Sequence, residues 1–421
     1  MKKIANHIAA FIPMFAMISS LAVAGGYQIN EHGARATGMG GAFAAQASDG
    51  SAMFFNAAGL GFQQGFNVLV GTTLIFPSTS FTGPGSSTTK TDMESQVFYP
   101  SNLYASYAID EQLVVGLGVF NPYGLGTEWA ETWSGRYHAV KTDLQTFYIN
   151  PTVAYKINDQ LAVGVGASYV IGTVLLEKNI PLRAIPGFPP TTPDGKSKLE
   201  GDGSGINFNA GILWKATEEL SVGVSYRHLT EIEFEGDATF TNIPAAAQGS
   251  FPSGVTGKAT LPMPSNIMAG VAYKINESIT VEGDFQYVGW KEYKELKVEF
   301  NKAVGGQTTQ TSAKDWNDGT LVRIGGEYKL NEQLALRLGY IRDMTPQPEK
   351  SVEPMLPDAD RNDITVGGSY KINENLAVDA SFMMVLFEDR DSKFSSPSLG
   401  DFFGTYKSSA SLVSLNIGYS F

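Results

Sequence analysis

The chain has 421 residues, with 46 glycines, no cysteine and a formal net charge of −12 at pH 7. The lack of cysteine excludes a disulfide framework and thiolate metal sites, and the negative charge disfavours nucleic acid as a partner. No apolar segment of about 18 residues follows the first 24 residues, so we expect no membrane-spanning helix in the mature chain.

Residues 1–24 have the pattern of a secretory signal peptide. A Lys2-Lys3 pair gives a positive start, residues 8–21 are apolar, and Ala22-Val23-Ala24 forms an A-x-A cleavage site. A retained transmembrane helix is the alternative, but the apolar stretch is short and has no stop-transfer pattern behind it. We therefore expect a mature protein that begins at Gly25 and lies outside the cytoplasm.

Residues 25–64 show no strand alternation and are rich in small residues, a composition that suits a compact plug. Gly38-Met39-Gly40-Gly41 invites a phosphate-loop interpretation, yet no strand precedes it and no Gly-Lys-Ser/Thr follows it. We expect this segment to fill the lumen of the barrel predicted below, which would otherwise be a wide channel.

A short motif recurs six times along the rest of the chain: an aromatic residue, a few polar residues, then alternating apolar residues. Asn, Asp and Glu between two alternating runs predict a tight hairpin turn. The spacings of 48, 59, 59, 55 and 42 residues are too irregular for a stacked-repeat solenoid and favour hairpins with variable far loops. The motif begins at Tyr107, Tyr155, Trp214, Tyr273, Tyr328 and Tyr370.

Six turns join six pairs of strands, and one strand before the first turn (about residues 66–76) and one after the last (about 406–421) make fourteen. An even number puts both termini on one side, as bacterial barrels require. Long polar connections lie opposite the short turns, at 77–95, 177–203, 236–262, 301–315 and 345–360. We therefore predict an all-β fold, a transmembrane antiparallel β-barrel of 14 strands over residues 65–421, with the short turns periplasmic.

The predicted strands have one apolar face and one small or polar face, as in Leu334, Leu336 and Leu338 against Arg337. A soluble sandwich would alternate too, but the turn-motif aromatics all sit at one distance from a short turn, which indicates a girdle at a membrane interface. A charge at the lipid midplane costs about 2–4 kcal/mol. Six charged residues alternate with the apolar side chains of their strands and should therefore face the lumen: Arg227, Glu282, Arg323, Glu327, Arg337 and Asp379.

The last predicted strand alternates up to the terminal residue, with Val413, Leu415, Ile417, Tyr419 and Phe421 on one face. An ordinary soluble terminus would fray. A closing strand with a terminal Phe resembles the recognition signal of outer-membrane barrels. We therefore expect the barrel-assembly machinery of a Gram-negative cell to bind through Phe421.

The segment Gly25–Leu60 resembles the N-terminal hatch of the FadL family of outer-membrane fatty-acid and aromatic-hydrocarbon transporters. The matching stretches are Gly-Tyr-Gln-Ile-Asn-Glu after the signal site, Gly-Met-Gly-Gly-Ala-Phe, and Phe-Asn-Ala-Ala-Gly-Leu. The family usually has Asn-Pro-Ala where this chain has Asn56, Ala57 and Ala58, a departure that keeps the asparagine but loosens the local backbone. The strand count and the terminal Phe also match, so the resemblance covers the mature chain.

A second match lies at the end of the third strand, at Phe120, Asn121, Pro122, Tyr123 and Gly124. Proline cannot donate to a ladder and glycine weakens a strand, so a break in pairing is expected here. From sequence alone, the strand simply ending at its loop is an equal alternative. The resemblance implies an inward kink at these residues that opens a lateral gap in the wall.

The resemblance also implies passive uptake of hydrophobic small molecules: capture in a loop groove, transfer to an inner pocket, and lateral release when the hatch shifts. Burial contributes about 0.8 kcal/mol per methylene, so an apolar cavity binds such a ligand without energy input. The candidates are Leu182, Ile185 and Phe188 for the groove and Phe43, Met53, Phe54 and Phe55 for the pocket. Loop packing and plug packing without ligand are the alternatives.

A fatty acid, the expected substrate, needs a positive partner for its carboxylate. Lys178, high on the fifth strand, occupies roughly the position where family members hold a basic residue. Arg227, Arg323 and Arg337 are further luminal candidates, although luminal arginines usually pair with wall carboxylates. If no base reaches the pocket, an aromatic hydrocarbon becomes the better substrate.

Three other functions remain as alternatives. A general porin needs an open lumen, against which segment 25–64 argues. A lipid hydrolase needs a nucleophile with a placed histidine, and none of His32, His138 and His228 lies in a recognisable catalytic motif. A structural adhesion barrel is the third. We expect no enzyme activity, no cofactor and no metal, and a monomer surrounded by outer-membrane lipid.

Overall fold

The computed structural model describes residues 25–396 and 398–421, so the predicted signal peptide over residues 1–24 lies outside the described residues. None of the helices in the described ranges is long and apolar enough to cross a membrane.

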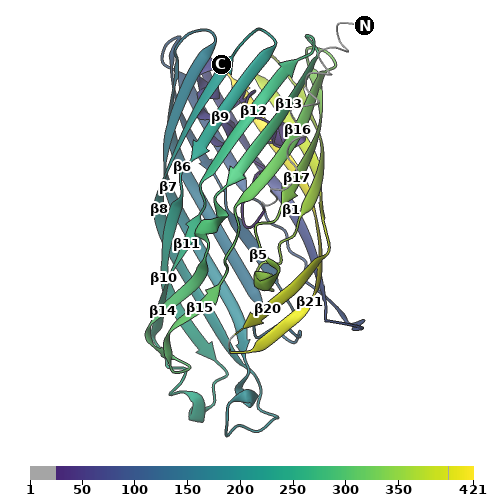
Figure 1. Ribbon diagram of the computed structural model, residues 1–421. Helices are drawn as coiled ribbons and strands as arrows, with labels where there is room; N and C mark the ends of the chain where they lie inside the picture. The colour runs from purple at the N-terminus through teal and green to yellow at the C-terminus, as the bar shows by residue number, and fades with distance from the viewer. Residues whose placement is uncertain (1–24, 397) are drawn as a thin grey trace.

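The strands form one closed antiparallel sheet, in which the first strand pairs with the last over sixteen residue pairs, from Asn67↔Ser420 to Thr82↔Thr405. Six wall strands consist of two segments in line (β4/β5, β9/β10, β11/β12, β13/β14, β15/β16 and β19/β20), and the short β2 lies beside the end of β1. The twenty-one segments therefore make a wall of fourteen strands. The predicted all-β, 14-stranded antiparallel barrel is confirmed (Figure 1).

The strand bounds, in chain order, are β1 (Phe66–Thr82), β2 (Lys90–Asp92), β3 (Ser101–Ala108), β4 (Leu113–Phe120), β5 (Gly124–Glu128), β6 (Lys141–Lys156), β7 (Leu161–Ile180), β8 (Gly195–Lys215), β9 (Leu220–Arg227), β10 (Thr230–Thr241), β11 (Val255–Met263), β12 (Asn266–Lys274), β13 (Ile279–Val288), β14 (Glu295–Val304), β15 (Gln307–Ala313), β16 (Gly319–Lys329), β17 (Leu334–Met344), β18 (Arg361–Lys371), β19 (Leu376–Phe387), β20 (Arg390–Ser396) and β21 (Gly400–Ser420). The helices are α2 (Ala34–Gly38), α3 (Ala52–Phe55) and the 3-10 turns η1 (Ala57–Phe62), η2 (Leu182–Ala184), η3 (Ala245–Ala247), η4 (Trp290–Glu292) and η5 (Glu349–Ser351).

The six short turns share one hydrogen-bond pattern, in which a side-chain oxygen accepts two backbone amides. In the second turn, Oδ1 of Asn158 accepts the N–H groups of Gln160 and Leu161 at 2.9 Å each. This local closure is the reason that the motif forms a hairpin, and it confirms the prediction. The equivalent oxygens belong to Asp110, Thr217, Asn276, Asn331 and Asn373.

The strands are longer at the opposite end than the sequence pattern predicted, so several of the expected long loops are wrong. The strand expected over 66–76 runs to Thr82, and the last strand begins at Gly400 rather than near Tyr406. Strand makes up about half of the stretches 177–203 and 236–262 and most of 301–315, which is a hairpin that turns at two glycines. Above the lipid, both faces of a strand contact water, so apolar alternation ends before the strand does.

The outer surface carries a band of exposed apolar side chains bordered by the turn-motif aromatics. Trp214 and Tyr370 are about half exposed, at 49% and 52%, although they belong to strands of a large closed sheet. The six charged residues predicted to face the lumen are all buried, with exposures of 0–8%. A barrel embedded in lipid has this arrangement, with apolar side chains on the outside and charged side chains on the inside.

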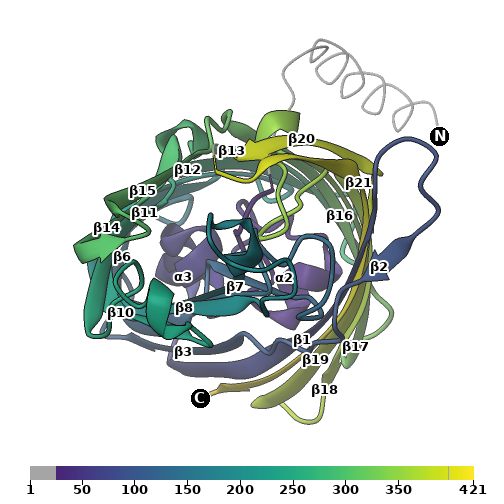
Figure 2. The ribbon, with the colours of Figure 1, turned by 90° about the horizontal axis from the view of Figure 1, so that it is seen from below.

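Residues 25–64 lie inside the barrel, where α2 and α3 cross the lumen (Figure 2). Nearly all of their side chains are buried, including Phe43, Met53 and Phe55. α2 packs against β17–β19 and β21, and η1 packs against β6–β8. The predicted hatch inside the lumen is confirmed.

Candidate functional site

Two wall carboxylates hold the centre of the hatch through its backbone. Oδ2 of Asp284 accepts the N–H groups of residues 43 and 44 at 2.9 and 3.0 Å. The carboxylate of Glu282 accepts those of residues 45 and 46 at 2.6 and 3.1 Å. These oxygens satisfy four buried N–H groups, which would cost free energy if they were left unpaired. Glu282 therefore anchors the hatch and does not pair with a luminal arginine.

An ion-pair chain fixes α2 to the same side of the wall. Arg35 of the hatch contacts Glu327 at 3.1 Å, and Glu327 contacts Arg337 at 2.8 Å. Arg337 also reaches Asp379 at 3.4 Å. The charge of Arg337 is therefore already balanced by two wall carboxylates. Arg323 is fully buried beside Gly41, and it is not among the residues that line the two cavities described below.

The asparagine of the Asn56-Ala57-Ala58 motif ties three chain segments together. Its Nδ2 donates to the carbonyl oxygens of Ala44 and Ile212 at 2.8 and 3.0 Å, and its Oδ1 accepts the N–H of Ala58 at 3.2 Å. The motif thus links the hatch to β8 and begins η1 with a side-chain cap.

The aromatic residues predicted to line a pocket pack into the hatch–wall core instead. Phe43, Met53, Phe54 and Phe55 have exposures of 0–8% and belong to the main apolar cluster. The reason is Arg227, which donates to the carbonyl oxygens of Met53 and Phe54 and lies 5.4 Å from the ring centre of Phe120. Arg227 thus connects α3 to the barrel wall, and the aromatic side chains pack between them.

The third strand of the barrel is broken at the predicted position. β4 ends at Phe120 and β5 begins at Gly124, and both segments pair with β6. On its other edge the break is hydrogen-bonded to the start of the hatch: the N–H of Ile29 donates to the carbonyl oxygen of Pro122, and the N–H of Gly124 donates to that of Tyr27, both at 2.9 Å. We call residues 25–31 the hatch arm. The arm occupies the position that a neighbouring wall strand would hold.

The larger of two cavities, with a volume of about 510 Å³, passes through this break, and we call it the exit cavity. Its inner walls include Glu31, Asp358 and Arg361. Its outer walls include Phe147 and Tyr99, which are 43% and 71% exposed on the lipid-facing side. The cavity therefore joins the lumen to the membrane.

The smaller cavity, of about 100 Å³, lies in the lumen above the hatch, and we call it the inner cavity. It shares three apolar residues with the exit cavity, namely Leu125, Leu144 and Leu356. Its other apolar lining comes from Tyr27, Val174, Leu176, Leu199, Phe234, Ala259, Leu261, Tyr293, Leu296, Val298, Trp316 and Met355. The shared leucines make a continuous apolar wall between the two cavities, and Tyr27 of the hatch arm borders the inner one.

Six charged residues line the inner cavity, of which the exposed Glu200, Glu235, Asp237 and Lys258 lie at its edge. Lys314 and Glu353 are the two buried ones, and they form an ion pair with each other. Lys178, near the end of β7, is exposed to water and lies within electrostatic reach of Glu353. Burial among the barrel walls lowers the pKa of Lys178 below its usual 10.5, and the charge of Glu353 opposes this effect. Two lysines therefore stand beside an apolar cavity with one carboxylate between them.

The predicted capture residues pack against the neighbouring hairpin. Leu182 is fully buried, and Ile185 and Phe188 contact a cluster that includes Phe240 and Phe251. They are not among the residues that line the two cavities. The loop is stabilised by its own apolar contacts at the end of the long β7–β8 hairpin.

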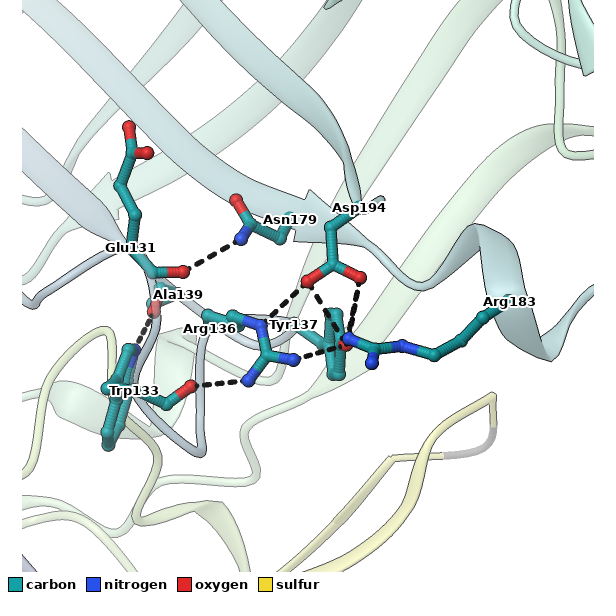
Figure 3. Close-up of polar contacts among 8 residues, drawn as sticks. All are labelled: Glu131, Trp133, Arg136, Tyr137, Ala139, Asn179, Arg183 and Asp194. Carbon is teal, nitrogen blue, oxygen red and sulfur yellow. Dashed lines mark hydrogen bonds and ion pairs between the residues drawn. The ribbon is translucent and has the colours of Figure 1, made fainter. Parts of the chain in front are cut away.

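A polar cluster ties a second loop, residues 129–139, to the β7–β8 loop at the same end (Figure 3). Asp194 accepts hydrogen bonds from Arg136 at 2.8 Å, from Arg183 at 2.9 Å and from the hydroxyl of Tyr137 at 3.0 Å. Trp129 of this loop is buried below it. The two loops together cover part of the lumen at the end far from the short turns (Figure 2).

Comparison with known proteins settles the family. The family model described as outer membrane protein transport protein (OMPP1/FadL/TodX) matches residues 15–421. The chain belongs to this FadL/TodX family of outer-membrane proteins. The resemblance inferred from the hatch motifs is thereby confirmed, and so is the outer-membrane location.

Curated FadL/TodX relatives are about one quarter identical. A long-chain fatty acid transport protein of Escherichia coli O6:H1 is 26% identical over 379 residues, covering 82% of this chain and 83% of the relative. The 47 kDa outer membrane protein of Pasteurella multocida is 26% identical over 440 residues and covers 96% of both chains.

Solved structures of FadL/TodX proteins share the fold. A Pseudomonas aeruginosa FadL homologue superposes with a TM-score of 0.83 at 19% identity, covering 94% of this chain and 100% of that one. The Pseudomonas putida toluene transporter TodX gives 0.72 at 17% identity, covering 96% and 99%.

Sequence reasoning missed the residues that line the inner cavity of this FadL/TodX protein, although one signal was present. On β7 the luminal face changes from small residues to Val170, Val174 and Leu176, which interrupts the alternation of apolar and small residues. An apolar run on the luminal face indicates a cavity for an apolar ligand. Lys314 and Glu353 come from loops without periodicity, and no local pattern reveals them.

Proposed function

We propose that this protein takes up hydrophobic small molecules passively, and that long-chain fatty acids are its main substrates. One observation carries the proposal: an apolar luminal cavity and a cavity that opens to the membrane share Leu125, Leu144 and Leu356. A ligand that moves along these leucines remains in contact with apolar surface, so no step requires transfer of its chain into water.

The carboxylate of a fatty acid has two candidate partners in Lys314 and Lys178. Glu353 already occupies Lys314, so an incoming carboxylate exchanges with a group of the same charge. The exchange leaves Glu353 without Lys314, and Lys178, whose charge also interacts with Glu353, is the cation that then balances it, because an unpaired buried charge would be costly. The tail then lies along Leu176 and Phe234 of the inner cavity.

Release follows when the hatch arm leaves the wall break. The arm is held there by two backbone hydrogen bonds, from Ile29 and Gly124, and its Tyr27 borders the inner cavity. Withdrawal of Tyr27 joins the inner and exit cavities, and the ligand reaches lipid past Phe147. We propose the kink residues Phe120–Gly124 as the lateral gate.

Neutral aromatic hydrocarbons are the second candidate substrates. The inner cavity of about 100 Å³ is bordered by Tyr27, Tyr293 and Trp316, whose rings meet edge to face at 5–6 Å. Because Lys314 and Glu353 neutralise each other, a small uncharged ring is accommodated without any exchange of partners. The P. putida neighbour is named a toluene transporter.

The domain limits and partners belong to the same proposal. We assign residues 1–24 to a signal peptide, 25–64 to the hatch and 65–421 to a barrel that works as a monomer in outer-membrane lipid. Phe421 exchanges backbone hydrogen bonds with Phe66 and its side chain is 83% exposed, which supports its role as a signal for the barrel-assembly machinery.

Uptake of radiolabelled oleate and toluene tests the proposal in cells that lack their own transporters for both. We expect oleate uptake to depend on the protein and to saturate. Mass spectrometry of the purified barrel should detect fatty acid or hydrocarbon in the lumen. Equal rates with and without the protein for both ligands, together with an empty lumen, would contradict the proposal.

A further inference from the structure

Two glycines of β5 carry apolar side chains that come from two other segments. Gly124 and Gly126 are two residues apart in the strand, so they share one face. A Cβ on Gly124 would lie 2.8 Å from Cδ1 of Ile29, in the hatch arm. A Cβ on Gly126 would overlap the ring of Phe98. Both side chains therefore lie directly on the strand backbone, and any larger residue in β5 would displace them.

The face that Gly126 presents to Phe98 is the lipid-facing one. Gly126 pairs with Asp143 of β6, which lies on the same face of β6 as Phe147, a residue 43% exposed to the membrane. Both chain neighbours of Asp143 are buried and line the inner cavity. The ring of Phe98 therefore covers β5 from the membrane side.

Phe98 belongs to segment 93–100, which replaces a wall strand beside the break. The neighbouring strand β3 begins only at Ser101, and beyond this point segment 93–100 lies between β1 and β5. Phe98 exchanges two backbone hydrogen bonds with Ile75 of β1, at 2.8 and 3.0 Å. On the β5 edge, the N–H of Glu94 donates to the carbonyl oxygen of Glu128 at 2.8 Å. Between these contacts, the ring of Phe98 closes the wall and lines the exit cavity.

The ring lies at the depth of the apolar band of the barrel. Leu74 and Phe76, on either side of Ile75, are 36% and 42% exposed on the lipid-facing surface. Lipid chains are as apolar as the present contacts of the ring, so turning Phe98 into the membrane costs little free energy. A ligand can therefore displace the ring, and the space that the ring gives up depends on how far it turns.

We propose that Phe98, seated on Gly126, is the outer barrier of the lateral gate and limits the cross-section of the molecules that leave. Unbranched chains and single aromatic rings pass beside a partly turned Phe98, whereas fused polycyclic molecules are held back. This inference rests on the proposed lateral release and deepens it, because it names the shape of the cargo and a specificity-determining residue.

The test measures how easily a molecule dissolved in the membrane enters the exit cavity. The chain has no cysteine, so Val385→Cys places a single thiol in the lining of this cavity, at a residue only 6% exposed. The folded barrel is reconstituted into phosphatidylcholine vesicles and labelled with two lipid-soluble maleimides. N-dodecylmaleimide carries a slender chain, and N-(1-pyrenyl)maleimide carries a fused polycyclic ring system. Mass spectrometry gives the rate of labelling by each reagent.

Phe98→Ala in this background should speed labelling by the pyrenyl reagent about tenfold and change labelling by the dodecyl reagent less than about twofold. Gly126→Ala, whose Cβ displaces the ring, should have the same effect. The combined variant should add nothing further, because both residues act through one contact. The matched controls are Phe208→Ala, at an exposed aromatic of β8, and Gly326→Ala, at a strand glycine whose Cβ would have its nearest neighbour at 4.0 Å. The heat-dependent gel shift of the folded barrel verifies that each variant folds.

Three results would overturn the inference. An unchanged rate with the pyrenyl reagent in Phe98→Ala would show that the ring does not limit entry. Equal acceleration of both reagents would assign the effect to a looser barrel. Effects of Phe98→Ala and Gly126→Ala that multiply in the combined variant would show that the two residues act separately. Labelling does not involve transport, so failure of this inference and failure of the proposed uptake give different results.

Discussion

The backbone N–H of Gly124 donates a 2.9 Å hydrogen bond to the carbonyl oxygen of Tyr27, so the broken wall strand is paired with β6 on one edge and with the hatch on the other. Gln28 and Tyr123 form an antiparallel bridge at the same place. The element that closes the side of the barrel is therefore part of the plug, and its removal opens the wall.

A disulfide between the arm and the break should stop transport. Residues 28 and 123 are cross-strand partners, whose Cα atoms lie about 4.5–5.5 Å apart, a distance that a disulfide spans. The native chain has no cysteine, so Gln28→Cys with Tyr123→Cys gives one possible bond. We expect oxidation to lower oleate uptake at least tenfold and reduction to restore it. Tyr123→Cys alone is the control; undiminished uptake in the oxidised double variant would show that the arm does not move.

Neutralising the ion pair of the inner cavity should separate the two substrate classes. Lys314→Gln with Glu353→Gln removes the exchangeable cation without leaving a buried unpaired charge. A hydrogen bond to a charged group is worth about 1.5–3 kcal/mol, so oleate affinity should fall about 10- to 100-fold while toluene uptake is retained. Lys350→Gln, at an exposed pair with Asp315, is the control. Equal losses for both ligands would contradict a role for Lys314 in carboxylate binding.

Fatty-acid binding should weaken at alkaline pH earlier than an ordinary lysine would predict. Burial lowers the pKa of Lys178, so its ammonium is lost below the usual 10.5. Burial penalises the charged form of Lys178, so its contribution to the free energy of unfolding should rise as the pH passes through the lowered pKa. The affinity for oleate should fall over the same pH range. Oleate titrations from pH 7 to 11 measure this. Lys178→Gln should flatten the curve, and an unchanged curve would assign the effect elsewhere.

Loss of the wall carboxylates should loosen the hatch. Glu282→Ala with Asp284→Ala removes the side-chain oxygens that accept four hatch amides, and buried N–H groups left without a partner cost about 1–3 kcal/mol each. We expect frequent ion-conducting openings in planar bilayers, whereas the wild type stays closed. Glu332→Gln, in an exposed short turn, serves for comparison. A closed double variant would mean that the ion pairs of α2 suffice.

Ala57→Pro should be tolerated. Ala57 is the first residue of η1, where an N–H has no partner within the helix, and Asn56 before it is extended, with φ −159° and ψ 100°. Proline at a compatible position stabilises by about 0.4–1 kcal/mol through the unfolded chain. Thermal unfolding measured by circular dichroism should give an equal or higher midpoint. A clear loss would indicate that the close contact with Gly164 leaves no room for the ring.

The sequence reveals the parts of this molecule that depend on local rules. The turn motif predicts each hairpin because one side chain, such as Asn158, closes its own turn. The break at Pro122 is predictable because proline lacks an N–H. The inner cavity is different: it joins residues of β6, β7, β8, β10, β11 and β14 with Tyr27, and only the barrel's closure brings them together. Lys314 and Glu353 are 39 residues apart, in two loops separated by β16 and β17, beyond the reach of any periodicity.

The side opening stands above a plug that is fixed by hydrogen bonds and ion pairs on the opposite wall. On the proposed route, cargo passes to the outer leaflet while the axial route stays shut. A bacterium that grows on a hydrophobic carbon source can therefore raise the copy number of this protein without making its outer membrane more permeable to small hydrophilic antibiotics.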